Sequence, residues 1–140
     1  MSSGAHTVAY FDRTYDEAIQ LMHEARDYFI DRQRQGGAGP HAAVQLVASC
    51  EAMRVTARLA QVLAWLLVQK AVHAGEISPA EAVAQNRRLG GRSVCAVEGP
   101  WHELGLPQDL QSLLARSLAL YNRVARLDDL AANSFVPAND

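Results

Sequence analysis

The sequence predicts an all-α protein, an antiparallel bundle of three main helices with a long central helix and one short accessory helix. No glycine or proline interrupts residues 41–74. Apolar residues recur at helical spacing both before this stretch, over 14–35, and after it, over 107–132. With 140 residues, the chain is long enough for one domain with its own core, which we expect to span 1–140.

The first helix is expected to run from about residue 14 to residue 35. Thr14 and Glu17 have the spacing of a capping box at the start of a helix. Its inward stripe is Ala18, Met22, Ala25 and Phe29. Residues 1–10 are small and polar, so we expect a flexible N-terminus. A short glycine-rich turn at 36–39 would make the first two helices antiparallel neighbours.

The central helix is expected over 40–74, opened by Pro40 and closed by Gly75. Its apolar residues form two stripes, whereas a helix with one wet face needs only one. The first stripe is a seam of mostly small residues at a and d spacing: Leu46, Cys50, Met53, Ala57, Ala60, Ala64, Leu67 and Ala71. The second is Val55, Leu59, Val62 and Leu66, widened by Trp65, Val68 and Val72.

Two apolar stripes are more than this short chain can cover with its other helices. We therefore expect a second copy of the protein to cover part of the central helix, giving a homodimer. We assign Leu59, Val62, Trp65 and Leu66 to the core or to the dimer interface.

The remaining elements follow from local signals. Ser78, Pro79 and Glu81 predict the start of a short accessory helix with a capping box. Residues 90–106 lack a helical period, and a connection of this length is often functional. The last helix is expected to begin at Pro107, with the heptad Leu110, Leu113, Ser117, Leu120, Val124, Leu127 and Ala131. We expect residues 133–140 to form a flexible tail.

Composition excludes several classes of function. The net charge of -2 supplies no overall basic field for nucleic acid. The most apolar run, 59–68, is too short for a membrane span of about 20 residues and contains Gln61. The N-terminus does not resemble a signal peptide, and the two cysteines, Cys50 and Cys95, lack metal-binding spacing. The expectation is a cytoplasmic protein.

The sequence offers no recognisable catalytic or metal constellation. The five histidines are scattered, without Glu-x-x-His spacing on a helix. No nucleophile elbow, phosphate-binding loop or paired nucleophile and base is readable. We therefore expect a protein that is not an enzyme and that carries no cofactor.

One polar group on the central helix stands out as a candidate site. Glu51 and Arg54 have the spacing of an ion pair, and Arg58 lies one turn beyond. They form either a solvated strip of salt bridges or a specific contact with a partner protein, since arginine suits planar carboxylate recognition. Trp101, in the irregular loop beside a proline, is a candidate anchor for a partner.

The central helix also resembles that of a known family. The run CEAMRVTARLAQVLAWLLVQKAVHAGEIS at 50–78, with LPQDLQSLLARSLALYNRVARLDD at 106–129, is similar to the RcdA (regulator of CtrA degradation) family of alphaproteobacteria. The matching positions of the helix are Glu51, Met53, Arg54, Thr56, Arg58, Leu59, Gln61, Trp65, Leu66, Leu67, Ala71, Gly75 and Glu76. The likeness covers about two thirds of the chain and is weaker over 76–105.

The resemblance implies a dimeric three-helix bundle that acts as an adaptor in regulated proteolysis. Family members help deliver cell-cycle regulators such as CtrA to the ClpXP protease, together with a response-regulator-like adaptor and a cyclic-di-GMP effector. They are not enzymes and bind no known cofactor. The tail expected here is shorter than the one linked to activity in the family.

Two other functions are open from the residues alone. One is a small-molecule-sensing or purely structural bundle, because Ala57, Ala60 and Ala64 could leave a cavity in the seam. The other is a DNA-binding regulator, which would use the basic cluster of Arg87, Arg88 and Arg92.

Overall fold

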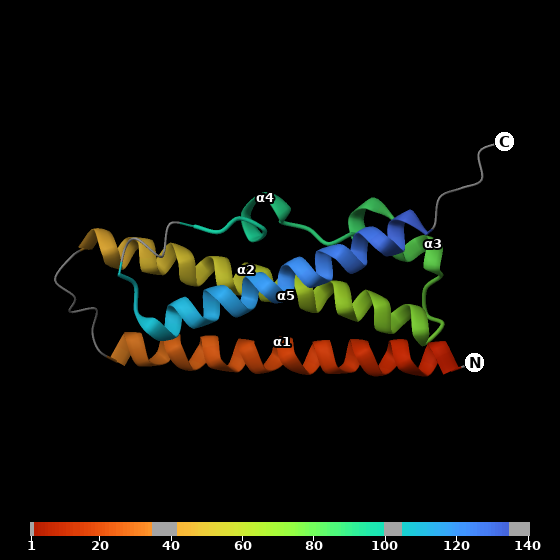
Figure 1. Ribbon diagram of the computed structural model, residues 1–140, viewed down its shortest axis with the longest axis horizontal. Coiled ribbons are helices and arrows are strands. Elements are labelled where there is room, and N and C mark those ends of the chain that lie inside the picture. Colours follow the sequence, from red (N-terminus) through yellow and green to blue (C-terminus); the bar gives the residue numbers. More distant parts are fainter. Residues whose placement is uncertain (1, 35–41, 100–104, 135–140) are drawn as a thin grey trace.

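The computed structural model describes residues 2–34, 42–99 and 105–134. Its helices are α1 (Ser2–Arg34), α2 (Ala42–His73), α3 (Pro79–Ala82), α4 (Arg92–Cys95) and α5 (Gln108–Asn133), with a 3-10 turn at Gln85–Arg87. These described residues contain no strand, so the predicted all-α class is confirmed (Figure 1).

The three long helices α1, α2 and α5 lie side by side along the length of the molecule (Figure 1). Helices α1 and α2 are antiparallel, since Phe11 near the start of α1 packs against Trp65 and His73 near the end of α2. Helices α2 and α5 are parallel instead, because Arg58 contacts Leu114 and Trp65 contacts Asp128 further along both helices.

The predicted antiparallel bundle is therefore wrong for the pair of α2 and α5. The chain between them does not turn back sharply. It returns along the bundle from the end of α2 towards its start, carrying α3 and α4, and α5 then begins beside the first half of α2 (Figure 1). A long connection of this kind is what two neighbouring parallel helices require.

Helix α1 begins at Ser2, about three turns before the predicted start, so the expected flexible segment at 1–10 is helical from residue 2. Thr14 lies inside the helix and is buried, and its hydroxyl donates a hydrogen bond of 2.9 Å to the carbonyl of Tyr10. This bond one turn back replaces the predicted capping role. Ala18, Leu21, Ala25 and Tyr28 form the buried stripe of α1, with Met22 and Phe29 half-buried.

Helix α2 is one unbroken rod of 32 residues, as predicted. Gly75 lies just past its end with a φ of 77°, a conformation that favours glycine. The amides of Gly75 and Glu76 donate to the carbonyls of Val72 and Ala71, at 3.1 and 2.9 Å, which closes a Schellman motif. Pro40, the predicted opening residue, and the glycine-rich turn lie outside the described residues.

Only one of the two apolar stripes of α2 faces the bundle. The second stripe is buried, and it includes all four residues assigned to the core or the dimer, Leu59, Val62, Trp65 and Leu66. The first stripe faces outward, with Leu46, Cys50, Met53, Ala60, Ala64 and Leu67 exposed. The side chains of the second stripe are larger, so burying them removes more apolar area from water.

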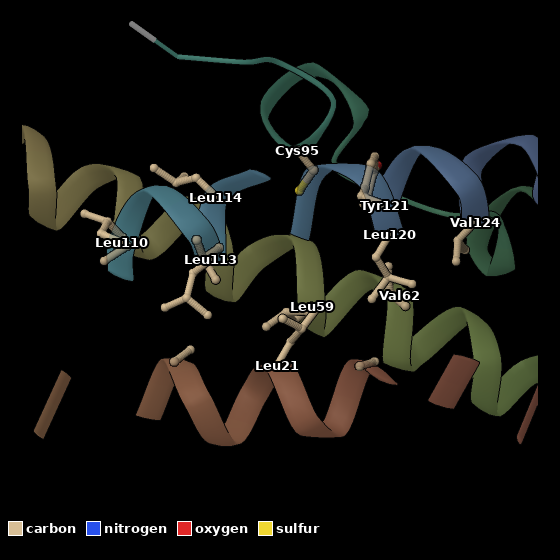
Figure 2. Close-up of a cluster of buried hydrophobic side chains, with 14 of the residues drawn as sticks. Leu21, Leu59, Val62, Cys95, Leu110, Leu113, Leu114, Leu120, Tyr121 and Val124 are labelled. Atoms are coloured by element: carbon tan, nitrogen blue, oxygen red, sulfur yellow. The ribbon is translucent and has the colours of Figure 1, made fainter. Parts of the chain in front are cut away.

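The core lies where α2 and α5 meet above α1 (Figure 2). Leucines and valines of all three helices fill it, and Cys95 of α4 reaches down onto α5 (Figure 2). The predicted heptad of α5 is buried at Leu110, Leu113, Ser117, Leu120 and Val124. The accessory helix also starts as predicted, since the Glu81 amide donates to the Ser78 hydroxyl at 3.1 Å.

By length and composition alone, α2 is apolar enough to cross a membrane. In the structure its inner face packs against α1 and α5, and the inward side chains include a charged one, Arg58, that bonds to α5. These contacts are those of the central helix of a bundle. The tail predicted at 133–140 begins at the last residue of α5, and residues 135–140 lie outside the described part.

Candidate protein-interaction site

The predicted ion pair on α2 is present. The Arg54 guanidinium donates from Nε to the Glu51 carboxylate at 3.1 Å. Arg54 also donates to the backbone carbonyl of Val94. Glu51 is buried, and the backbone at Gly99 lies against its carboxylate. A Cβ added to Gly99 would come within 2.6 Å of Glu51 Oε1, so the backbone at Gly99 closes directly onto this carboxylate.

Arg58 is fully buried, and its guanidinium is bonded entirely within the chain. Nε donates to the Cys95 carbonyl and Nη2 donates to the Val97 carbonyl, both at 2.8 Å. Nη1 donates to the Leu114 carbonyl at 3.0 Å and to the Ser117 hydroxyl at 3.1 Å. Burial lowers the pKa of Arg58, and the positive charge of Arg54 acts in the same direction.

A solvated strip of salt bridges is therefore wrong for Glu51 and Arg58. With no exposed surface, Arg58 cannot touch a partner in this conformation. Arg54 is the member of the group that keeps some exposure, 21% of its side chain.

Arg54 and Arg58 bond the backbone carbonyls of Val94, Cys95 and Val97, which belong to one segment, 90–97, that we call the strap. The strap contains α4 and lies across α2 and α5 (Figure 1). Besides Arg54 and Arg58, two other side chains hold its backbone at Gly90. The Tyr121 hydroxyl donates to the Gly90 carbonyl at 2.6 Å, and the Gly90 amide donates to Gln61 Oε1 at 3.2 Å. Burial raises the pKa of Tyr121 to about 12, so this hydroxyl keeps its proton.

A second polar cluster ties the strap to the end of α5. Asp128 is buried and accepts hydrogen bonds from Trp65 Nε1 at 3.0 Å, Arg88 Nε at 2.8 Å and Arg92 Nη2 at 2.7 Å. Arg88 and Arg92 also pair with Asp129, at 2.9 Å each. The hydrogen bond from Arg92 lowers the pKa of Asp129.

The basic cluster considered for DNA binding is thus neutralised within the chain. Arg88 and Arg92 pair with two aspartates of α5, and Arg87 lies 3.7 Å from the Glu81 carboxylate. Arginines that are already committed to carboxylates have little charge left for phosphates.

The outer face of α2 presents large apolar side chains to solvent. Met53 is 71% exposed, Leu46 67% and Leu67 54%. Beside it, a hollow of about 380 Å³ runs between α1 and α2, lined by Met22, Ala25, Arg26, Phe29, Ile30, Gln33 and Thr56. Large exposed apolar side chains along one helix are typical of a surface that binds another protein.

The cavity suggested by the small residues of the seam is not formed. Ala60 and Ala64 are exposed on the outer face of α2, and Ala57 is half-buried. Alanines on an open surface enclose nothing, so the small-molecule reading loses the feature that supported it. Trp101, the other predicted anchor, lies outside the described residues. In the part of the chain that is described, no group of three or more His, Cys, Asp or Glu side chains could hold a metal ion.

Comparison with known proteins places this arrangement in a family. Residues 4–140 match a family described as "Protein of unknown function (DUF1465)". The crystal structure of RcdA from Caulobacter crescentus CB15 is similar with a TM-score of 0.65 and 39% sequence identity, over 86% of this chain and 89% of that one. The chain belongs to the RcdA family. No curated protein sequence matches it.

Membership in the RcdA family confirms the resemblance read from the α2 motif and supports a related adaptor role. The motif residues of α2 divide between the two sides of the helix, and Met53 and Leu67 lie on its exposed outer face. Arg58 and Trp65 point into contacts with the strap and α5, whereas Glu51 pairs with Arg54 and lies against Gly99. The sequence placed Ser117 in the heptad of the last helix without a polar role, and it did not single out Tyr121 or Asp128, although these α5 residues bond Arg58, Gly90 and Trp65 in turn.

Proposed function

We propose that this chain is a non-catalytic adaptor of the RcdA family. It would work in the cytoplasm as a single domain and a homodimer, helping to deliver cell-cycle regulators to the ClpXP protease. The observation that carries the proposal is the exposed apolar face of α2, which the bundle leaves uncovered. Its support from relatives is the similarity to RcdA.

The outer face of α2 suits a protein partner better than water. Leu46, Met53 and Leu67 lie on one side of a straight helix, and Cys50, Ala60 and Ala64 lie between them. Small residues between large ones let a second helix approach closely, which is the geometry of an a and d seam. The core of the bundle is already filled from the other side, so burying this face needs another chain.

We assign this outer face to the interface between two copies. In an antiparallel pair of α2 helices, Leu46 of one copy would lie against Leu67 of the other. The neighbouring side chains of α1, Met22, Phe29 and Ile30, widen the contact towards the roughly 800 Å² per partner of a stable interface.

Light scattering tests the dimer. We expect a mass of twice the 15.3 kDa chain for the wild type and the mass of one chain for Leu67→Asp. The matched control is Leu130→Asp, which changes an exposed leucine on α5 (65%, against 54% for Leu67) and should leave the dimer intact. A wild type that stays monomeric at high concentration would remove the dimer from the proposal.

The adaptor role is tested by capture of purified ClpX with its co-adaptors on the immobilised protein. Arg54, which is partly exposed beside the strap, is the polar residue of α2 that we propose for contact with these partners. We expect Arg54→Ala to reduce recovery and Arg116→Ala, an exposed arginine on α5, to leave it unchanged. Absence of any recovery by the wild type, with no protein stabilised in cells that lack this chain, would refute the proteolysis role.

A further inference from the structure

The strap is held more firmly than a surface loop needs to be. Side chains of α2 and α5 bond its backbone at Gly90, Val94, Cys95 and Val97. Its own Arg92 side chain adds ion pairs with Asp128 and Asp129. Each of these bonds joins the strap to α2 or α5, so the backbone of the strap is held in one position relative to the bundle.

Two of these contacts cap the single turn α4. The last carbonyls of a helix have no partner within it, and basic side chains can satisfy them. Arg54 donates to the carbonyl of Val94 and Arg58 to that of Cys95. A four-residue helix is marginal alone, so these two arginines account for its presence here.

The fixed backbone holds two apolar side chains out in solvent. Val94 is 51% exposed and Val97 is 46% exposed, whereas Cys95 between them is buried and anchors the strap. A loop that displays apolar side chains while a rigid scaffold fixes its backbone has already lost the entropy that binding would otherwise cost. This is the property of a pre-organised binding loop.

We propose that the strap is a second binding surface of this protein, that its occupant is a short apolar segment of a partner protein, and that Arg58 is a positioning residue for it. The proposal rests on the proposed function as an adaptor. Two valines offer far less area than the roughly 800 Å² per partner of a stable dimer, which argues against a second copy as occupant. A small contact of this kind fits a segment that is held briefly and then released.

The probe is a library of random peptides displayed on phage and selected on the immobilised full-length protein. We expect apolar peptides to be enriched, and a selected peptide to bind at least about tenfold more weakly to Val94→Asp and Val97→Asp. Val94→Ser is the milder variant if an aspartate disturbs the fold. Leu130→Asp is the control, since it places the same charge at an exposed leucine of α5 outside the strap.

Three outcomes overturn the proposal. The first is that no peptide is enriched. The second is that Leu46→Asp and Met53→Asp weaken the binding of the enriched peptides while the strap variants do not. In the third, Val94→Asp lowers the mass of the dimer, which would make the strap an interface between copies. None of these results depends on capture of ClpX, so failure of the strap and failure of the proteolysis role are separate observations.

The positioning role of Arg58 is tested through the strap itself. Arg58→Lys keeps the charge but loses the planar fork that reaches several carbonyls at once. Tyr121→Phe removes only the hydroxyl bonded to Gly90. We expect both variants to speed hydrogen exchange of the amides at 92–97 about tenfold and to weaken the selected peptide, without faster exchange at Leu59 and Val62. Faster exchange in the strap with unchanged peptide affinity would refute the role.

Discussion

The two sides of α2 use their residues in opposite ways. The inner side combines large apolar residues with Glu51 and Arg58, and every one of these side chains finds its partner within the chain. The outer side is apolar too, yet Met53 and Leu67 have more than half of their surface in water. Similar hydropathy on two faces of one helix therefore serves two purposes, folding on one side and, as we propose, association on the other.

Among substitutions on the two sides of α2, we expect the largest loss in the free energy of unfolding on the inner side, at Arg58. Arg58→Ala should lower the free energy of unfolding by about 3–5 kcal/mol, because the buried acceptors of Cys95, Val97, Leu114 and Ser117 lose their donor. Urea unfolding measures it.

The matched control for Arg58 is Arg116→Ala. Arg116 pairs with Glu24 on the exposed side of α5, and the loss should stay within about 1 kcal/mol. Equal losses for the two variants would mean that the buried bonds of Arg58 contribute no more than a surface ion pair.

The next effect compares two leucines on the same helix. Leu59→Ala should cost about 3 kcal/mol, since a buried leucine leaves a cavity. Leu67→Ala should change the free energy of unfolding by less than about 0.5 kcal/mol in dilute protein. If the outer face forms the dimer, the cost of Leu67→Ala grows with protein concentration. A concentration-independent loss near that of Leu59→Ala would show that both faces belong to the core.

A smaller effect is expected at the end of α5, where two adjacent aspartates differ in burial. Asp128→Asn should cost about 2 kcal/mol, because two charged hydrogen bonds from Arg88 and Arg92 end on a buried carboxylate. Asp129→Asn should cost less than about 1 kcal/mol, since this carboxylate is half exposed. Thermal unfolding of the two variants side by side measures the difference, and a reversed order would contradict the assigned burial.

The smallest effect is a dependence on pH. The hydrogen bond from Arg92 lowers the pKa of Asp129 in the folded protein below the ordinary value of about 3.9. Its contribution is therefore complete above that pH and is lost as the pH falls through the lower, folded value. Stability should decline below about pH 4, and Asp129→Asn should make the decline shallower by a few tenths of a kcal/mol. Urea unfolding at several pH values measures the decline, and the same loss of unfolding free energy in acid for the wild type and Asp129→Asn would contradict this.

Local signals predicted the helices themselves. Gly75 ends α2 and Ser78 starts α3 because each acts on backbone groups within a few residues. Thr14 shows the limit of such signals. Its spacing to Glu17 fits a cap, yet its hydroxyl serves equally well inside a longer helix, bonded to Tyr10.

What could not be predicted depends on contacts far apart in the sequence. Both stripes of α2 are apolar, so the pattern alone could not say which would face α5. The direction of α5 depends on a connection that runs back along the bundle. Glu51 and Arg58 have the spacing of a surface strip, but the strap and α5 bury Arg58, and the backbone at Gly99 lies against Glu51.

Gly99 lies in the connection between α4 and α5, where most substitutions would ordinarily be tolerated. Its backbone closes onto Glu51, so even a methyl group there would meet the carboxylate and push it away from Arg54. A tag or a foreign loop inserted into this part of the chain should therefore leave Gly99 in place.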